Sequence, residues 1–205
     1  MTLQLKHSVW LVYFFLTVGV IGMATPWSAI FVNLTPMMLL MILVVLLYLQ
    51  QVREAKRIAL IGLIFTIGYA AEILGVNTGV PFGNYTYGST LGPKWLETPP
   101  MIGVNWVIVS LISVSLVPFK NEWLKLFLSA GILVLLDILI EPVAIHFEWW
   151  TWEEGIVPLQ NYVGWYVVGL VANFIGMEVV KERQYTAMLG AGMFVFFVAL
   201  NILVN

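Results

Sequence analysis

The chain has 205 residues, 61% of them hydrophobic and 10% charged, and its formal net charge is -2 at pH 7. Soluble domains are about half apolar and about a quarter charged, so this composition predicts a single integral membrane domain over residues 1–205. The acidic balance argues against a nucleic-acid partner, and the absence of Cys excludes disulfides and thiolate metal sites.

Long apolar stretches follow one another along the whole chain. A helix needs about 20 apolar residues to cross the hydrocarbon core of a bilayer. The first stretch lacks the small-residue cleavage site of a signal peptide, and further stretches follow it, so we interpret it as a helix of the mature protein. We therefore expect an all-α, multi-pass helix bundle in the cell membrane, with about seven transmembrane helices near residues 8–24, 35–50, 58–76, 100–118, 124–144, 158–180 and 185–204.

The basic residues predict the orientation of the bundle. All but one of them fall at the amino terminus or in alternate connections between the spans, and cytoplasmic loops are enriched in Lys and Arg. The amino terminus is then inside and the carboxyl terminus outside. The residues on the predicted cytoplasmic side are Lys6, Arg53, Lys56, Arg57, Lys120, Lys125, Lys181 and Arg183.

Two long connections, 77–99 and 145–157, are expected on the outer side. The first is rich in Gly, Pro and Tyr, which predicts an ordered segment made of turns. The second carries Trp149, Trp150 and Trp152. An aromatic belt at the membrane interface is the favoured interpretation of these tryptophans, and a lid over a lipid-like substrate is the alternative.

Five polar side chains lie at one depth in the predicted spans. Glu72 and Asp137 each stand about 20 Å from the inner boundary, at 1.5 Å per helical residue, and Glu141 lies one turn beyond Asp137 on the same helix face. Asn105 and Asn161 lie near the outer starts of two other spans. Ionisable groups in hydrocarbon are functional candidates, whereas a purely structural hydrogen-bond network would need only neutral amides. For the asparagines alone, both interpretations stay open.

The chemistry of this predicted site follows from its surroundings. Removal from water favours the protonated form of a carboxyl group, and a second carboxylate nearby adds to the effect. Such a group can donate its proton. Aromatic faces stabilise cations, although simple packing explains any single ring equally well. A proton donor among aromatic rings suits the protonation of an alkene to a carbocation. The candidate substrate-binding aromatics are Phe82, Tyr85, Tyr87, Trp106, Tyr162 and Trp165.

Several of these residues belong to segments that together resemble a known family. The order and spacing of the segments are similar to the signature of the membrane-bound carotenoid hydratases, of the bisanhydrobacterioruberin and gamma-carotene 1'-hydratase type. The match runs from the third span into the sixth. The matching segments are AEILG (71–75), TGVPFGNYTY (78–87), LGP (91–93), DILIEPVA (137–144), WTW (150–152) and PLQNYVGW (158–165).

The resemblance implies a hydro-lyase that needs no cofactor and adds water to the terminal double bond of an acyclic carotenoid end. An acid would protonate C2 of the terminal isoprene unit, and water would quench the tertiary cation at C1. The resemblance and the depth of the residues suggest Glu72 or Asp137 as donor, with Glu141 as partner or base. Asn105 and Asn161 would orient the water or the acids. Implied partners are an acyclic or monocyclic carotenoid, the lipid bilayer and other carotenoid-pathway enzymes.

Other functions remain open at this stage. A membrane lycopene cyclase would make the same cation and trap it with an internal double bond, which requires a dry pocket. A small proton-coupled carrier would use buried carboxylates as a relay, but the acids occupy one level only. A membrane prenyltransferase needs paired aspartate-rich motifs, and the chain has too few acids for them.

Overall fold

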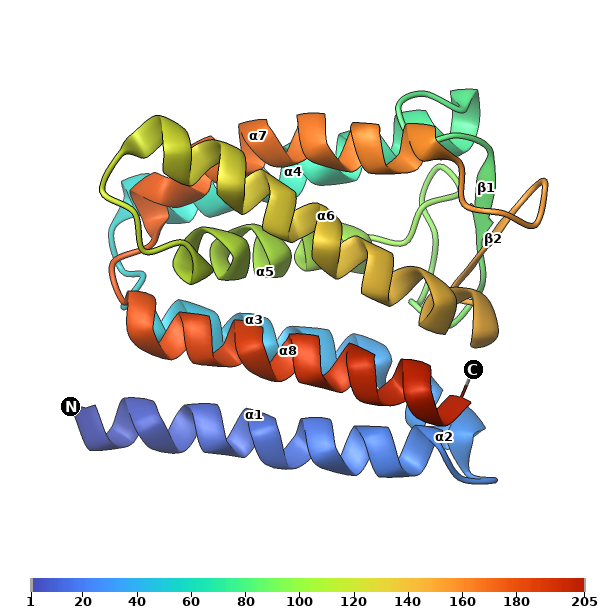
Figure 1. The fold of residues 1–205 in the computed structure, drawn as a ribbon, viewed down its shortest axis with the longest axis horizontal. Helices are drawn as coiled ribbons and strands as arrows, with labels where there is room; N and C mark the ends of the chain where they lie inside the picture. Colours follow the sequence, from blue (N-terminus) through green and yellow to red (C-terminus); the bar gives the residue numbers. More distant parts are fainter. Residues whose placement is uncertain (1, 205) are drawn as a thin grey trace.

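The computed structural model describes residues 2–204, and it confirms the all-α class (Figure 1). Met1 and Asn205, which belong to the predicted single domain, lie outside the described residues. The helices are α1 (Thr2–Met23), α2 (Ser28–Asn33), α3 (Thr35–Leu49), α4 (Ala55–Thr78), α5 (Met101–Leu116), α6 (Glu122–His146), α7 (Leu159–Val179) and α8 (Arg183–Val204), and the strands are β1 (Tyr85–Tyr87) and β2 (Trp150–Trp152).

Every predicted span coincides with a helix, but the helices differ in length. Within the described residues, five are long and apolar enough to cross a membrane, namely α1, α4, α6, α7 and α8. Helices α3 and α5 have 15 and 16 residues, fewer than the roughly 20 that a crossing normally needs. The structure therefore fits a membrane protein, whereas the count of seven crossings and the orientation stay predictions.

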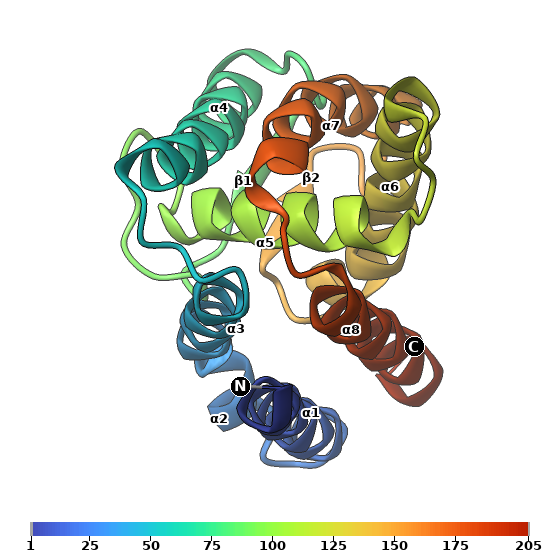
Figure 2. The same cartoon turned by 90° about the vertical axis from the view of Figure 1, so that its left-hand side faces the viewer.

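Helix α5 forms the centre of the bundle. Every residue from Ile102 to Ser115 is buried, and α5 contacts α3, α4, α6, α7 and α8. Figure 2 shows α4, α7 and α6 grouped around one side of α5, with α3, α8 and α1 on the other side. Because neighbouring helices cover these residues on all faces, α5 is an internal element rather than a lipid-facing one.

The connections between helices gather at two opposite ends of the molecule. Figure 1 shows the amino terminus at the same end as the α3–α4, α5–α6 and α7–α8 connections, and it shows β1 and β2 at the other end. At the first end, buried Arg57 donates to the carbonyl oxygens of Gln50 at 2.7 Å and Val179 at 2.5 Å. These carbonyls lie where α3 and α7 finish, and the last carbonyls of a helix lack partners within it, so Arg57 ties the two helix ends together.

The two long connections meet as a small antiparallel sheet. Tyr85 pairs with Trp152, Thr86 with Thr151 and Tyr87 with Trp150. Because side chains alternate along a strand, the four aromatic side chains are buried on one face while both threonines are exposed. The first connection is an ordered segment with turns, as the sequence predicts, and it also contains the short strand β1. The aromatic-belt interpretation is wrong for Trp149, Trp150 and Trp152, which are 5%, 7% and 7% exposed.

Candidate active site

Glu72 of α4 is surrounded by three hydrogen-bond donors. Its Oε2 atom accepts from the hydroxyl of Tyr85 at 2.5 Å and from that of Tyr87 at 2.6 Å, and its Oε1 atom accepts from Trp106 Nε1 at 2.9 Å. The Glu72 side chain is buried. An ionised carboxylate only accepts hydrogen bonds and an indole N–H only donates, so this arrangement is complementary to a carboxylate.

A glycine on α4 makes room for this arrangement. A Cβ atom at Gly75, nearly one turn beyond Glu72, would lie 2.8 Å from the Tyr85 hydroxyl oxygen and 2.8 Å from Phe82 Cδ2. Contacts that short do not occur around real Cβ atoms. The absence of a side chain at Gly75 therefore lets β1 approach α4 closely enough for its tyrosines to reach Glu72.

The β1 tyrosines stay protonated at neutral pH. Burial raises the pKa of Tyr85 and of Tyr87 well above the usual tyrosine value, and the nearby charge of Glu72 raises both further. A tyrosine with such a raised pKa keeps its hydroxyl proton. Both side chains are therefore fixed as O–H groups that can donate to Glu72.

Glu141 of α6 has a matching environment built from β2. Its Oε2 atom accepts from Trp150 Nε1 and from Trp152 Nε1, both at 3.0 Å, and its Oε1 atom accepts from Asn161 Nδ2 at 3.2 Å. None of these nitrogens can accept a hydrogen bond. Each strand of the small sheet thus supplies two donors, separated by one residue, to one buried glutamate: β1 to Glu72 and β2 to Glu141.

Asp137 is the carboxyl group with the fewest partners. Its Oδ2 atom accepts from Asn161 Nδ2 at 2.8 Å, while its buried Oδ1 atom has no hydrogen-bond partner within residues 2–204. The same Asn161 nitrogen therefore joins Asp137 to Glu141. Nearly all buried polar atoms in proteins are hydrogen-bonded, so Asp137 Oδ1 stands out as an oxygen that can still make a bond. No group of acids in the described part of the chain is arranged to hold a metal ion.

Aromatic rings cover one side of the acids. The rings of Trp106 and Trp165 stack with their centroids 4.4 Å apart, and the Phe82 ring lies 6.3 Å from Trp106 and 6.5 Å from Trp165. All three are buried. Tyr162 is half-buried and, among the described residues, no hydrogen bond or ring contact joins it to this group.

A small polar cavity of about 10 Å³ lies between Glu72, Glu141 and the aromatic rings, and Asp137 does not line it. A cavity measured in this way needs roughly 10–15 Å³ to hold one water molecule, together with polar partners. The space is thus about the size of a single water. Its lining residues are Glu72, Phe82, Tyr85, Tyr87, Ile102, Glu141, Trp150, Trp152, Asn161 and Trp165.

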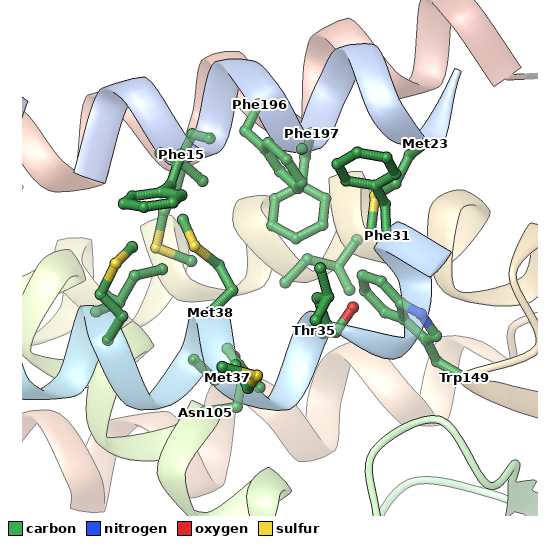
Figure 3. A pocket seen from close by; sticks show the side chains of 18 of the residues that line it. Phe15, Met23, Phe31, Thr35, Met37, Met38, Asn105, Trp149, Phe196 and Phe197 are labelled. Carbon is green, nitrogen blue, oxygen red and sulfur yellow. The ribbon is translucent and has the colours of Figure 1, made fainter. Parts of the chain in front are cut away.

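Figure 3 shows a second, apolar cavity, which has a volume of about 380 Å³. Most of its lining residues come from α1, α3 and α8, and others come from α2, α5, α6 and β2. Ile102 and Trp150 line both cavities. Asn105 also lines the apolar cavity, and within residues 2–204 no hydrogen bond joins its side chain to the acids. The structure thus places Asn105 against the apolar space rather than in the acid cluster.

The apolar cavity opens on the outer surface of the helices. Phe15, Leu34 and Met37 line it, yet they are 43%, 44% and 67% exposed. Figure 3 shows α1, which carries Phe15, and α3, which carries Met37, on facing sides of the space. In a bilayer, a lipid-facing opening of this kind admits a hydrocarbon chain without passage through water.

The structure therefore brings together most, but not all, of the side chains singled out from the sequence. Asn161 is hydrogen-bonded to Asp137 and Glu141, and Glu72 lines the same small cavity as Glu141, whereas Asn105 and Tyr162 do not join this group. Sequence reasoning missed Trp150 and Trp152 as partners of Glu141. The signal for them is the alternation of Trp, Thr and Trp, which is typical of a strand with two aromatic side chains on one face.

Two comparisons with known proteins find similar sequences. A family model described as "carotenoid biosynthesis protein" matches residues 8–205. The bisanhydrobacterioruberin hydratase of Haloarcula japonica is 31% identical over 127 residues, which cover 56% of this chain and 42% of that protein. The match thus spans less than half of the relative's length. No solved structure matches at a significant level.

Proposed function

This chain belongs to the carotenoid biosynthesis protein family, and from that membership we propose that it is a carotenoid 1,2-hydratase. It adds water to the terminal double bond of an acyclic carotenoid end group by acid catalysis. The observation that carries the proposal is the unpartnered, buried oxygen of Asp137 inside a cluster of three carboxyl groups. The name of the Haloarcula relative, a hydratase, supports the reaction class.

Asp137 is the proton donor in this proposal. Asp137 and Glu141 both accept a hydrogen bond from the side-chain nitrogen of Asn161, so the two carboxyl groups are close neighbours. Two neighbouring carboxylates repel each other, so the pair retains one proton. Glu141 receives three N–H groups and Asp137 only one, so the proton resides on Asp137. At Oδ1 it has no competing acceptor within residues 2–204. It passes to C2 of the alkene, whose π electrons form the C–H bond, and C1 becomes a tertiary cation.

The two glutamates complete the reaction. Fixed negative charges next to a developing cation lower the barrier to its formation, and the stacked rings of Trp106 and Trp165 add their negative faces. A water oxygen then bonds to C1 and gives up a proton to Glu141. Glu141 returns a proton to Asp137, its partner across Asn161, so the cycle consumes no net protons.

The polar cavity favours hydration over ring closure. It offers space of about one water molecule between Glu72, Glu141 and Asn161, whereas a cyclase has no use for water at its cation. A carrier would need ionisable groups beyond the acid cluster. Two turns from Asp137 the buried polar groups are neutral, where Asn173 bonds with Ser113 and Ser129.

Expression in a lycopene-producing bacterium tests the proposal. Pigments extracted from these cells should gain the mass of one or two waters, and the Asp137→Asn variant, expressed at the same level in the membrane, should leave the pigments unchanged. Ring closure would instead shift the absorption spectrum at constant mass. A correctly inserted protein that alters neither mass nor spectrum would overturn the proposal.

A further inference from the structure

Methionine is concentrated in the wall of the apolar cavity. Five of the nine methionines in the chain line this cavity, from α1, α3 and α8, and Figure 3 shows the side chain of Met38 between α3 and α1. Methionine is unbranched and flexible, and binding surfaces that accept ligands of different shape use it often. This enrichment indicates a wall that adapts to its ligand. The methionines of the wall are Met23, Met37, Met38, Met41 and Met193.

The three methionines of α3 have room to move. Met37 is 67% exposed, and Met38 and Met41 are half-buried. Residues three and four apart lie on the same face of a helix, so Met37 and Met38 both lie beside Met41, and the three form one thioether surface along the cavity. Because part of each side chain is not packed against protein, it can change rotamer to follow the contour of a bound chain.

The wall next to the acids is rigid by comparison. Ile102 and Trp150, which line both cavities, are only 3% and 7% exposed. A β-branched side chain such as that of Ile102 has few accessible rotamers, and Trp150 is fixed through its Nε1 atom, which donates to Glu141. The end of a molecule that reaches the acids therefore meets a fixed shape, whereas the remainder meets an adaptable one.

The proposed reaction requires only the end of the substrate. The tertiary cation at C1 is stabilised by its alkyl substituents and not by the polyene, because saturated carbons separate the terminal double bond of lycopene from its conjugated system. Acyclic isoprenoids in which every double bond is isolated carry the same end group. Their chains are flexible, whereas a conjugated polyene is stiff, so only an adaptable wall accommodates both.

We propose that this protein also hydrates acyclic isoprenoids that lack a conjugated polyene, and that Met37, Met38 and Met41 determine this range of substrates. The inference rests on the proposed function, because it uses the same acids. The terminal alkene passes Ile102 and Trp150, and the flexible remainder lies on the thioether surface of α3. A proton adds to one alkene carbon, a water oxygen bonds to the other and gives up a proton, and the product is a tertiary alcohol.

Hydration of squalene by the native protein in lipid nanodiscs tests the substrate class, with lycopene in a parallel reaction. Both substrates should gain the mass of water. Replacing Met37, Met38 and Met41 together by Ile keeps the wall apolar and removes its flexibility. The kcat/KM for squalene should then fall about tenfold relative to that for lycopene, the effect of a changed shape in an apolar wall. The matched control replaces Met177 and Met188, which do not line the cavity, by Ile.

Each result decides a separate point. Hydration of lycopene but not of squalene by the native protein would overturn the inference and leave the proposed function standing. Hydration of squalene alone would keep the substrate class and overturn the carotenoid function, and an inserted protein that hydrates neither would overturn both. Equal losses for the two substrates in the triple variant, or the same selective loss in the control, would contradict the role of the α3 methionines.

Discussion

Replacing each buried acid by its amide separates the roles of the three carboxyl groups. Asp137→Asn keeps an acceptor towards Asn161 and places its new NH₂ group at the position of the unpartnered oxygen, so no hydrogen bond is lost. The Asp137→Asn variant should therefore have the same melting temperature as the native protein. Its turnover should fall by about 10²–10⁴-fold, because it has lost the general acid.

Glu141→Gln should behave differently, because both oxygens of Glu141 face N–H groups that cannot accept. The new NH₂ group must face either Asn161 or the two indoles. If the Asn161 amide turns to accept it, its N–H bond to Asp137 is lost. One lost buried bond costs about 1–3 kcal/mol, which corresponds to a melting temperature about 2–12 °C lower for a chain of this size. Glu72→Gln should be milder, because the tyrosine hydroxyls can rotate and accept.

Thermal unfolding in detergent, followed by tryptophan fluorescence, gives the stability order, and pigment conversion in membranes gives the activity order. The expected pattern is an inactive but stable Asp137→Asn and a destabilised Glu141→Gln. Turnover near the native rate in Asp137→Asn would refute the assignment of the acid. Equal melting temperatures for the two variants would refute the argument from donor-only surroundings.

Three further substitutions test the supports of the site. Tyr87→Phe removes one of the donors to the α4 glutamate, so conversion should fall about tenfold with the pigment bound as before; unchanged conversion would contradict the need for this donor. Gly75→Ala should impair conversion, because the added methyl group would push β1 away from α4. Gly62→Ala should leave conversion unchanged, because the space around Gly62 is open. Equal activities of the two variants would contradict the idea that Gly75 lets β1 approach α4. Arg57→Met should destabilise the fold by about 2–4 kcal/mol through its lost carbonyl bonds, while Lys56→Met, which breaks only an exposed ion pair, should melt normally; matching melting curves would disprove the helix-tying role.

Depth along the helices could be predicted from the sequence, and rotation about the helix axes could not. The spacing of apolar runs places Asp137, Asn105 and Asn161 at one level. Whether an asparagine then faces the acids depends on how its helix is rotated, which is set by packing against neighbours and leaves no mark on hydropathy. For this reason Asn161 lies beside the acids, as predicted, whereas Asn105 lines the apolar cavity instead.

The small sheet that binds the two glutamates could not be predicted from the sequence for a different reason. Its strands have three residues each, too few to establish a period of two. Their pairing joins Tyr85 to Trp152 across a long stretch of chain, and such register depends on contacts that only the folded bundle brings together. Helix α5 could be predicted as a helix but not as the central one, because a buried central helix and a membrane span have the same apolar composition.

The single acid cluster of the described residues restricts how a pigment with two identical ends is processed. The apolar cavity that adjoins this cluster brings one end of a long polyene to the acids, while the other end lies away from them. The far terminus cannot be engaged at the same time as the near one. A symmetrical molecule has to detach, turn round and dock again, and a half-converted intermediate should build up before the doubly converted pigment does.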